Sequence, residues 1–459
     1  MLPEALAQQL KSHGQEHLVQ HAAGLAAHEA ARFAADIASL DFALLRTLQQ
    51  SLRSGPPAAP QVIEPLPQLV RGADAAGDSA ARVRGEAMLK AGRVAAFVVA
   101  GGQGTRLGAS GPKGKHPAAA ISGASLFQVF AEKLLHRGRK AGRAIPWCVM
   151  TSPENDSDTQ EFFAQHAFFG LDPNDVLFFQ QGTLPALDDA GRLLLRSATA
   201  LFRSPDGHGG SLRALHQSGA LQQLRARGVE QLFYFQVDNP LVDMCDPVFL
   251  GRHQLTLSEF SSKAVPKRAA DEKVGVLGRL DGAAGVIEYS DLPAHLREAR
   301  DADGQLRFRA GNIAVHVLDC AFIERLVTGS LQLPWHRARK EIPCFDAAVG
   351  NSSRVGTKFE LFIFDAMPLA QRIMVMEVER RVEFSPIKNR SGDDSPDSCR
   401  RDSMELHACW LERAGFAVPR DATGALAVRV EISPLTALGP EDISALRLQP
   451  FTRNQDILL

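Results

Sequence analysis

A glycine-rich stretch at residues 98–117, VVAGGQGTRLGASGPKGKHP, holds the side chains best suited to chemistry. It follows an apolar run and interleaves six glycines with one arginine, two lysines and one histidine. A glycine-rich turn after a buried strand lets backbone N–H groups converge on phosphate oxygens, because no Cβ blocks the approach. The cations Arg106, Lys113 and Lys115 indicate an anionic ligand rather than a turn that only packs. The stretch therefore predicts a phosphate-binding loop.

Two common phosphate-binding motifs do not fit this loop. No G-x-x-x-x-G-K-[ST] occurs in it, which excludes a Walker A loop. Gly102 and Gly104 give G-x-G, but residue 107 is a leucine. No acidic residue ends a second strand about 20 residues further on, so a dinucleotide-binding fingerprint is excluded as well. The pattern that remains is G-x-G-T-R followed by P-K, from Gly102 to Lys113.

The overall composition narrows the class of protein. The 459 residues carry a formal net charge of −1, so no global basic field attracts nucleic acid. Six cysteines are scattered without a C-x-x-C pair or a Cys/His cluster, which argues against a disulfide framework and a structural zinc site. The N-terminus is polar where a secretory leader is apolar, and no window approaches the ~18 apolar residues of a membrane span. We expect a cytoplasmic protein of roughly two to four folding units that binds neither nucleic acid nor a membrane.

Short apolar runs alternate with helical patterns in the middle of the chain. Such alternation is typical of a mostly parallel sheet with helices on both faces. The runs lie at residues 95–100, 145–152, 175–182 and 231–240, and helical patterns occur at 125–142 and 210–228. Further strand candidates follow one another closely and predict an antiparallel extension; they lie at residues 273–282, 284–292 and 311–319. We therefore expect an α/β domain here.

The two ends of the chain have different patterns. Residues 2–52 have apolar residues three and four apart, which predicts two or three helices. The proline-rich segment 54–67 cannot continue a helix, and a short helix is expected around residues 80–91. Towards the C-terminus we expect a loop at 391–403, a helix at 403–415 and a small β unit at 425–439. The expected regions are an N-terminal helical segment (1–90), the central α/β domain (91–382) and a small C-terminal α+β domain (383–459).

The loop and a series of further motifs resemble those of one enzyme family. G-x-G-T-R…P-K resembles the signature of sugar-1-phosphate nucleotidyltransferases, and the longer form GGQGTRLG…PKG, with its extra Gly114, resembles that of UDP-sugar pyrophosphorylases. Within that family the chain is most similar to the eukaryotic-type UDP-N-acetylglucosamine pyrophosphorylases. Other family motifs occur in order over almost the whole chain, among them GQEHL (14–18), FFQQGTLPAL (178–187), SPDGHGG (204–210), FQVDNPLV (235–242), AGNIAVHV (310–317) and EFSPIKN (383–389).

This resemblance implies a fold and a reaction. The fold is a Rossmann-like, GT-A-like mixed sheet flanked by helices. The reaction joins UTP to a sugar 1-phosphate, here N-acetylglucosamine 1-phosphate, and releases pyrophosphate. A sugar-phosphate oxygen attacks the α-phosphorus in line, so the enzyme needs no nucleophile of its own and works by positioning and charge neutralisation. The implied cofactor is Mg²⁺.

Basic side chains and one carboxylate would carry this chemistry. The resemblance assigns Arg106 and Lys113 to the triphosphate and the leaving pyrophosphate, and Lys388 of FSPIKN to the sugar phosphate or the α-phosphate. Asp238 follows the apolar run FYFQV, where a carboxylate at the C-terminal edge of a strand faces the ligand crevice of an α/β sheet. By resemblance Asp238 binds Mg²⁺, which suits a carboxylate combined with phosphate oxygens. A turn or cap formed with Asn239 is the other interpretation of this carboxylate.

The resemblance also implies contacts to the nucleotide and the sugar. An amide presents a donor and an acceptor to the edge of uracil, and Gln181 is preferred to Gln180 because of its offset to Gly182. Lys263 and Lys267 resemble lysines that support phosphates, although solvated lysines are an equally good interpretation. The nucleotide contacts are Ala100, Gly101, Gly102, Gly104, Thr105, Gln181, Gly207 and Asp238, and the sugar contacts are His208, Gly209, Glu288, Tyr289 and Asn312.

The identity of the sugar stays open in the sequence. N-acetylglucosamine enzymes usually have GNGG where residues 207–210 here read GHGG, and GHG resembles UDP-glucose and broad-specificity pyrophosphorylases. A UDP-glucose, UDP-galactose or broad-specificity enzyme is therefore the alternative that His208 supports. An inactive sugar-nucleotide-binding regulator is a second alternative, disfavoured because every charge-neutralising group is retained. The sequence predicts neither the oligomeric state nor roles for Lys115, His116 and residues 391–403.

Overall fold

The structure, a computed structural model, describes residues 2–54, 60–329, 333–346, 349–452 and 455–459. The chain divides into two compact units, each built from segments that are distant in sequence. Unit 1 combines Met1–Pro60, Gln181–Ser211 and Gln332–Asp365, and unit 2 combines Gln61–Gln180, Leu212–Leu331 and Ala366–Leu459. These units cut across the three consecutive regions expected at 1–90, 91–382 and 383–459. Those regions therefore stay a prediction about folding domains.

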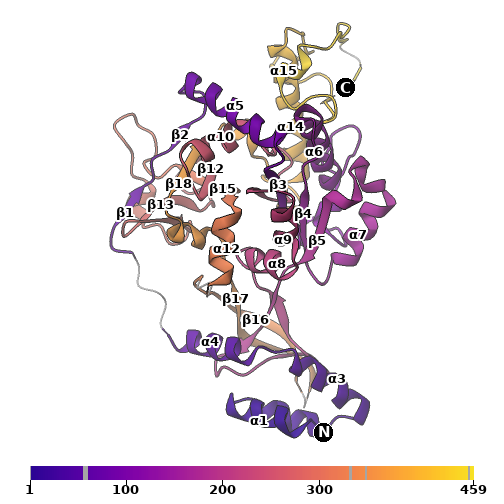
Figure 1. Ribbon diagram of the computed structural model, residues 1–459, viewed down its shortest axis with the longest axis vertical. Coiled ribbons are helices and arrows are strands. Elements are labelled where there is room, and N and C mark those ends of the chain that lie inside the picture. The colour runs from indigo at the N-terminus through magenta and orange to yellow at the C-terminus, as the bar shows by residue number, and fades with distance from the viewer. Residues whose placement is uncertain (1, 55–59, 330–332, 347–348, 453–454) are drawn as a thin grey trace. The chain divides into compact units, whose positions relative to one another are not determined.

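A mixed β-sheet forms the centre of unit 2 (Figure 1). Its main strands lie in the order β2-β18-β12-β15-β11-β3-β4-β5. β11, β3, β4 and β5 are parallel to one another, whereas β15 is antiparallel to both of its neighbours. The four apolar runs predicted as strands are confirmed as β3, β4, β5 and β11, and the candidate at 311–319 as β15, whereas β2, β12 and β18 were not predicted. The bounds are β2 (Leu69–Val70), β3 (Val94–Val99), β4 (Trp147–Thr151), β5 (Val176–Gln180), β11 (Gln231–Gln236), β12 (Phe260–Pro266), β15 (Ala310–Asp319) and β18 (Ile373–Glu377).

Three short strands extend this sheet in the antiparallel sense; the sequence predicted two of them, β13 and β14, but not β1, which lies in the proline-rich segment 54–67. β13 (Val276–Leu280) pairs with β1 (Ile63–Pro65) on one side and with β14 (Ala283–Ile287) on the other. A single pair, Val276 with Gly311, joins β13 to β15. The extension therefore places the segment after β14 beside the start of β15.

The strand order reverses between β3 and β11. From β3 the chain adds β4 and β5 on one side, and then returns to add β11 on the other side. Ligands of open α/β sheets bind in the crevice outside the carboxyl ends of the strands at such a reversal. The segments that follow Val99 and Gln236 are therefore expected to line a ligand site.

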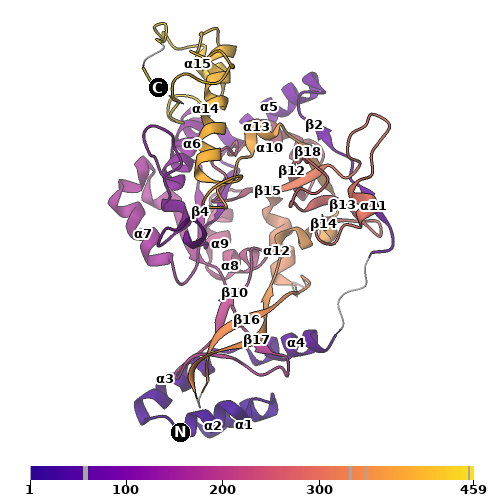
Figure 2. The same ribbon diagram turned by 180° about the vertical axis from the view of Figure 1, so that it is seen from behind.

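Helices cover both faces of the sheet. In Figures 1 and 2, α8, α9 and α12 lie on the opposite side of the strands from α5, α6 and α10. Apolar residues such as Phe127 and Phe130 of α6 and Phe249 of α10 share one buried core with Phe233 and Phe235 of β11. The bounds are α5 (Ala75–Lys90), α6 (Leu126–Ala141), α7 (Asp156–Gln165), α8 (Ser211–Gln217), α9 (Ala220–Ala226), α10 (Pro247–Leu255), α11 (Ala294–Arg297) and α12 (Cys320–Thr328).

Helices α5 and α10 cross closely, because a glycine on each faces the backbone of the other. A Cβ at Gly85 would clash with the carbonyl of Pro247, and a Cβ at Gly251 would clash with the carbonyl of Ala81. We expect Gly251→Val to lower the free energy of unfolding by about 3 kcal/mol, because the two helices must separate. Gly24→Ala is the control, since its nearest neighbour would be the His21 carbonyl oxygen at 3.6 Å. Urea unfolding of the two variants measures this difference, and equal midpoints would contradict it.

The C-terminal part of unit 2 corrects one expectation. Helix α14 (Pro396–Arg413) begins inside the polar stretch 391–403, which the sequence analysis assigned to a loop. The helix starts there because the Ser395 hydroxyl accepts a hydrogen bond from the Ser398 N–H and proline occupies the first helical position. Of the β unit expected at 425–439, only Val430–Glu431 forms a strand, and it pairs in parallel with Ile457–Leu458, outside the expected range. The elements, seen from behind in Figure 2, are α13 (Arg380–Glu383), α14, β19 (Val430–Glu431), α15 (Pro440–Ile443) and β20 (Ile457–Leu458).

Unit 1 combines N-terminal helices with a five-stranded sheet and a two-stranded sheet, neither of which was predicted from the sequence. Four helices replace the expected two or three: α1 (Glu4–Ser12), α2 (Glu16–Ala23), α3 (Ala27–Ala38) and α4 (Phe42–Arg53). The buried amide of Gln15 joins them to the sheet, because it donates to the Gly191 carbonyl and accepts from the Leu193 N–H. The five-stranded sheet contains β7 (Leu187–Asp188), β8 (Leu195–Ser197), β9 (Ala200–Leu201), β16 (His336–Asp346) and β17 (Gly350–Glu360). The two-stranded sheet pairs β6 (Thr183–Pro185) with β10 (Arg203–Pro205).

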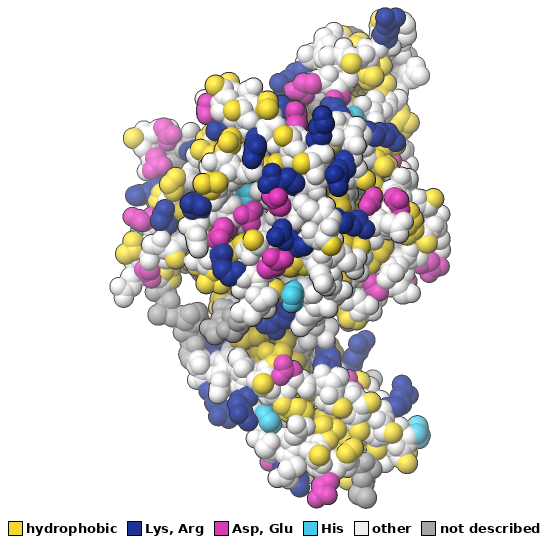
Figure 3. All heavy atoms as spheres, viewed as in Figure 1, with side chains coloured by type: hydrophobic (Ala, Val, Ile, Leu, Met, Phe, Trp, Pro, Cys, Tyr) yellow, Lys and Arg dark blue, Asp and Glu magenta, His cyan; other side chains and the backbone are white. Residues whose placement is uncertain are grey.

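The surface mixes charges of both signs. On the face shown in Figure 3, basic and acidic side chains are interspersed, in keeping with the net charge of −1. A surface of this kind creates no extended field of one sign. Within the described ranges, no helix has the length and apolar character needed to cross a membrane.

Candidate active site

The glycine-rich loop closes on itself directly after β3. The Lys113 N–H donates to the Gly102 carbonyl at 3.1 Å, and the Gly104 N–H donates to the Gly111 carbonyl at 2.9 Å. Two single turns of 3₁₀ helix lie within it, η1 (Thr105–Leu107) and η2 (Lys113–Lys115). The loop therefore carries Lys113 back to the carboxyl end of β3.

Asn155, which was not predicted as a site residue, holds the start of this loop. Its amide donates to the carbonyls of Ala100 at 3.0 Å and Gly102 at 3.4 Å, and its carbonyl accepts from the Ser152 N–H at 2.7 Å. The side chain is 1% exposed. A buried amide with both ends bonded fixes the backbone that it touches. The signal for Asn155 was its place just after the apolar run 145–152, at the same sheet edge as the loop.

Residues that follow Lys113 anchor the loop to its neighbouring helices. A Cβ at Gly114 would clash with the ring of Phe127, so glycine is required there by packing. The ammonium of Lys115 lies 5.4 Å from the ring centroid of Phe162. The carbonyl of His116 accepts from the N–H of Leu126 at 3.0 Å. Lys115 and His116, which had no predicted role, therefore attach the loop to α6 and α7.

Asp238 lies where three segments meet. Its carboxylate is 3.6 Å from the Lys113 ammonium, and its carbonyl accepts from the Ile387 N–H at 2.8 Å. The Val237 N–H donates to the Val99 carbonyl at 3.2 Å, which joins the ends of β11 and β3. The structure thus brings the predicted Asp238 together with Lys113 and with the segment that carries Lys388.

The two other predicted cations are exposed. The backbone N–H of Lys388 donates to the Asp394 carbonyl at 2.6 Å, and its ammonium lies 5.5 Å from the ring centroid of Phe384. Arg106 lies in η1 with an exposed side chain. Arg390, which the sequence analysis did not single out, lies across this turn, with its Cζ 3.7 Å from the position of a Cβ on Gly108. The roles of Arg106 and Lys388 stay predictions.

Lys263 and Lys267 have different surroundings. Lys263 is fully buried and forms ion pairs with Asp246 at 2.9 Å and Glu383 at 2.5 Å, so it belongs to a buried ionic cluster rather than to a solvated surface. The ammonium of Lys267 donates to the Ala270 carbonyl at 2.8 Å. Burial lowers the pKa of Lys267. Its expected contact with a phosphate stays a prediction.

Two of the residues expected to bind the sugar share a neighbour in unit 2. The Asn312 N–H donates to the Gly275 carbonyl at 2.8 Å, and a Glu288 carboxylate oxygen lies 3.5 Å from the position of a Cβ on Gly275. The Asn312 side chain accepts from the Ala314 N–H at 3.0 Å, at an irregularity where Ala314 has a φ of 54°. Tyr289, the next residue after Glu288, is 42% exposed.

The remaining predicted residues lie in unit 1. Gln181 is buried, whereas the preceding Gln180 uses its amide to donate to Asp156 at 2.9 Å, which favours Gln181 for a ligand. Gly207 has a φ of 83°, and a Cβ on it would lie 2.5 Å from the Leu361 carbonyl oxygen. The Gly209 N–H donates to that same carbonyl at 2.7 Å. These glycines are therefore required by close packing against Leu361.

His208 is held as a neutral hydrogen-bond donor. Its Nδ1 accepts from the Ile363 N–H at 3.1 Å, so the ring proton lies on Nε2. Its ring stacks on Phe362, with centroids 5.2 Å apart and planes at 14°. Burial, and secondarily the nearby His336, lowers the pKa of His208 to about 4. The imidazole is therefore uncharged at neutral pH.

Comparison with known proteins identifies the family. Residues 65–394 match the family model for UTP–glucose-1-phosphate uridylyltransferase. The chain belongs to this uridylyltransferase family.

Two similar proteins and one solved structure support the same assignment. UDP-N-acetylglucosamine diphosphorylase 2 of Arabidopsis thaliana is 36% identical over 96% of this chain and 91% of that protein. UDP-N-acetylglucosamine pyrophosphorylase of Saccharomyces cerevisiae is 38% identical over 80% of this chain and 78% of its own. The crystal structure of the uridine diphosphate N-acetylglucosamine pyrophosphorylase of Trypanosoma brucei, in complex with an inhibitor, has a TM-score of 0.81 at 28% identity, covering 96% of this chain and 94% of that one. The expected α/β fold with a mixed sheet and helices is confirmed.

The donor set of this uridylyltransferase site suits a metal ion that takes most of its ligands from the substrate. Among the described residues, no group of three or more His, Cys, Asp or Glu side chains is arranged to hold a metal. Asp238 offers one carboxylate beside the Lys113 ammonium. Mg²⁺ is usually bound by one or two carboxylates, substrate phosphates and water, so the residues present fit it.

Proposed function

We propose that this protein transfers the uridylyl group of UTP to N-acetylglucosamine 1-phosphate, forming UDP-N-acetylglucosamine and pyrophosphate. The observation that carries the proposal is the meeting of Lys113, Asp238 and the Ile387–Lys388 segment at the carboxyl ends of β3 and β11. The named relatives favour N-acetylglucosamine as the sugar. The six cysteines are all free, in keeping with a reducing cytoplasm.

The reaction needs charge neutralisation and alignment rather than a protein nucleophile. Lys113 and Arg106 bind the triphosphate and the departing pyrophosphate, and Lys388 binds the incoming sugar phosphate, so that its oxygen lies in line with the α-phosphorus. Asp238 would hold Mg²⁺, which supplies further positive charge to the phosphate oxygens when bound. We assign the sheet a GT-A-like arrangement, in which these groups would act at the strand-order reversal.

Backbone and amide groups would select the base. The backbone of Ala100, Gly101, Gly102, Gly104 and Thr105 would cover the nucleotide, and Gln181 would bind the uracil edge. Gly207 lies beside the base or ribose. For the sugar we assign the hydroxyl groups to Glu288 and Tyr289, and the acetamido group to Asn312, His208 and Gly209. Lys267 supports a phosphate.

An assay of pyrophosphate release from UTP and Mg²⁺ tests this proposal. The acceptors are the 1-phosphates of N-acetylglucosamine, N-acetylgalactosamine, glucose and galactose. We expect the highest kcat/KM with N-acetylglucosamine 1-phosphate. A flat profile would support the broad-specificity alternative, and no release with any acceptor would reject uridylyl transfer.

His208 is the observation that favours the broad-specificity alternative, and it gives a separate prediction. We expect His208→Asn to raise the preference for N-acetylglucosamine over glucose 1-phosphate about tenfold, because an amide bonds both ends of an acetamido group whereas Nε2 only donates. The wild-type preference should not change between about pH 6 and 8, because the lowered pKa of His208 keeps the ring neutral there. The measurement is kcat/KM for both sugars at each pH, and an unchanged preference in the variant would remove His208 from the sugar site.

A further inference from the structure

Asn239 lies next to Asp238, and its amide is bonded across to the chain that leads to Lys388. Its Nδ2 donates to the Glu383 carbonyl at 2.7 Å, and its Oδ1 accepts from the Ser385 N–H at 3.1 Å. The side chain is 3% exposed. The two ends of the Asn239 amide therefore bind the backbone of two residues in one segment, Glu383 and Ser385.

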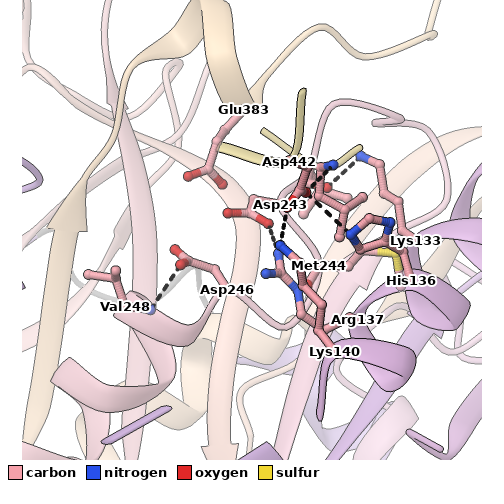
Figure 4. A network of polar contacts seen from close by, with 12 residues as sticks. Lys133, His136, Arg137, Lys140, Asp243, Met244, Asp246, Val248, Glu383 and Asp442 are labelled. Atoms are coloured by element: carbon pink, nitrogen blue, oxygen red, sulfur yellow. Dashed lines mark hydrogen bonds and ion pairs between the residues drawn. The ribbon is translucent and has the colours of Figure 1, made fainter. Parts of the chain in front are cut away.

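Glu383 is fixed by a buried ionic cluster. The Glu383 carboxylate pairs with Lys263 at 2.5 Å and with Arg71 at 3.3 Å, and Asp246 pairs with the same two cations at 2.9 and 2.5 Å. Figure 4 shows the side chains of Glu383 and Asp246 directed toward the same region, with Asp243 beside them. Lys263, Asp246 and Glu383 are buried, so this cluster resists displacement, because moving one member takes a charge partner away from the buried groups that remain.

The chain that follows Asn239 is also held. The buried ammonium of Lys133 donates to the carbonyls of Pro240 at 2.6 Å and Val242 at 2.7 Å. Burial lowers the pKa of Lys133 to about 8. The Asn239 amide is thus a link between two anchored segments rather than a flexible contact.

The hydrogen bond to Ser385 sets the position of Lys388. From Ser385 the chain continues to Ile387, whose N–H donates to the Asp238 carbonyl at 2.8 Å, and Lys388 comes next. A slip of two residues along this pairing would move Lys388 by about 6–7 Å, which is further than a phosphate contact tolerates.

We propose that Asn239 is a positioning residue that sets the distance between the metal-binding carboxylate of Asp238 and the ammonium of Lys388. This inference rests on the proposed function, because it assumes that both groups act on the substrate phosphates. Asn239 touches neither substrate nor metal in this scheme. Its effect on turnover passes through the register of residues 383–388.

A double-mutant cycle tests the proposal on the full-length protein. Asn239→Ala, Lys388→Ala and the double variant are compared with the wild type by kcat and KM for pyrophosphate release, together with thermal unfolding. We expect Asn239→Ala to lower kcat about 30-fold with little change in the KM for UTP, because a misplaced group costs transition-state contacts first. In the Lys388→Ala background the same change should lower kcat less than about threefold, since the group that it positions is already gone.

Gln15→Ala is the matched control. Gln15 is also a fully buried amide with both ends bonded across segments, but it lies in unit 1 and has no role in the proposed chemistry. It should lower the unfolding temperature and leave kcat unchanged. Asn239→Ser, which keeps one hydrogen-bonding group, replaces the alanine variant in the cycle if that variant does not fold.

Two results would overturn the inference. One is a 30-fold loss from the Asn239 change in both backgrounds, which shows that it acts independently of Lys388. The other is a lowered unfolding temperature with wild-type kcat, which shows a purely structural amide. Failure of the proposed function is distinguishable, because the wild type itself would then release no pyrophosphate with any acceptor.

Discussion

Asp238→Asn is expected to lower kcat about 10³-fold at saturating UTP and sugar phosphate, equivalent to about 4 kcal/mol of transition-state stabilisation. The amide keeps the shape of the side chain, and the Asp238 backbone carbonyl still accepts from the Ile387 N–H. What is lost is the negative charge that would hold Mg²⁺ against the phosphates and that lies 3.6 Å from Lys113. The Mg²⁺ concentration for half-maximal rate should rise.

Pyrophosphate release, measured over a Mg²⁺ series, checks this prediction. Asp175→Asn is the control, because it removes a carboxylate that is paired with Arg227 at 2.9 Å and has no assigned role in the reaction. It should behave as wild type. A wild-type rate and Mg²⁺ profile in Asp238→Asn would leave only the alternative interpretation of this residue, a turn or cap.

Strands β3, β4, β5 and β11 of unit 2 could be predicted because each is an apolar run that needs no knowledge of its partner, whereas β12, which contains Ser261, Ser262 and Lys263, and β18 were not predicted. All five residues of β4 and five of the six in β11 are buried, as expected for strands covered on both faces. β16 was missed for the opposite reason. Only Ile342 and Cys344 are buried in its eleven residues, and its stability comes from pairing along its whole length with β17.

The start of α14 was missed although its local signal was present. Ser395 and Pro396 form an N-cap and first-turn pair, but the surrounding residues are polar and show no helical period. The helix is held by buried residues along its length: Cys399 and Leu406 pack into the main core of unit 2, and Leu411 packs into the C-terminal core. The polar composition of residues 391–403 favoured a loop prediction over the capping signal. In the fold, tertiary packing stabilises the helix that the capping residues begin.

The residues of the candidate site also fall into a group that the sequence predicted and a group that it did not. Motif position predicted that Lys113, Asp238 and Lys388 act together, and the structure brings Lys113, Asp238 and the backbone next to Lys388 into contact. The residues that hold them, Asn155 and Asn239, make their contacts across segments that are far apart in sequence. Such partners depend on the tertiary structure, so one sequence alone does not reveal them.

Lys388→Ala is the second change with a large expected effect. We expect kcat to fall about 10³-fold, because an ammonium directed at a developing phosphate charge is worth about 3–4 kcal/mol in a transition state. The side chain is exposed while residues 383–387 are buried, so the thermal unfolding temperature should stay within about 1 °C of wild type. The KM for UTP should change much less than kcat if Lys388 acts on the incoming sugar phosphate.

Three comparisons make this assignment specific. Lys90→Ala removes another exposed lysine, at the end of α5, and should leave turnover unchanged. Lys388→Arg keeps the charge but changes its geometry, and should recover part of the rate. Added ethylamine should restore some pyrophosphate release in Lys388→Ala and none in Asp238→Asn, because only the first variant lacks an ammonium. Full activity of Lys388→Ala without the amine would show that other groups neutralise the charge on the sugar phosphate. Arg390, which lies across Gly108, would then be the first residue to replace.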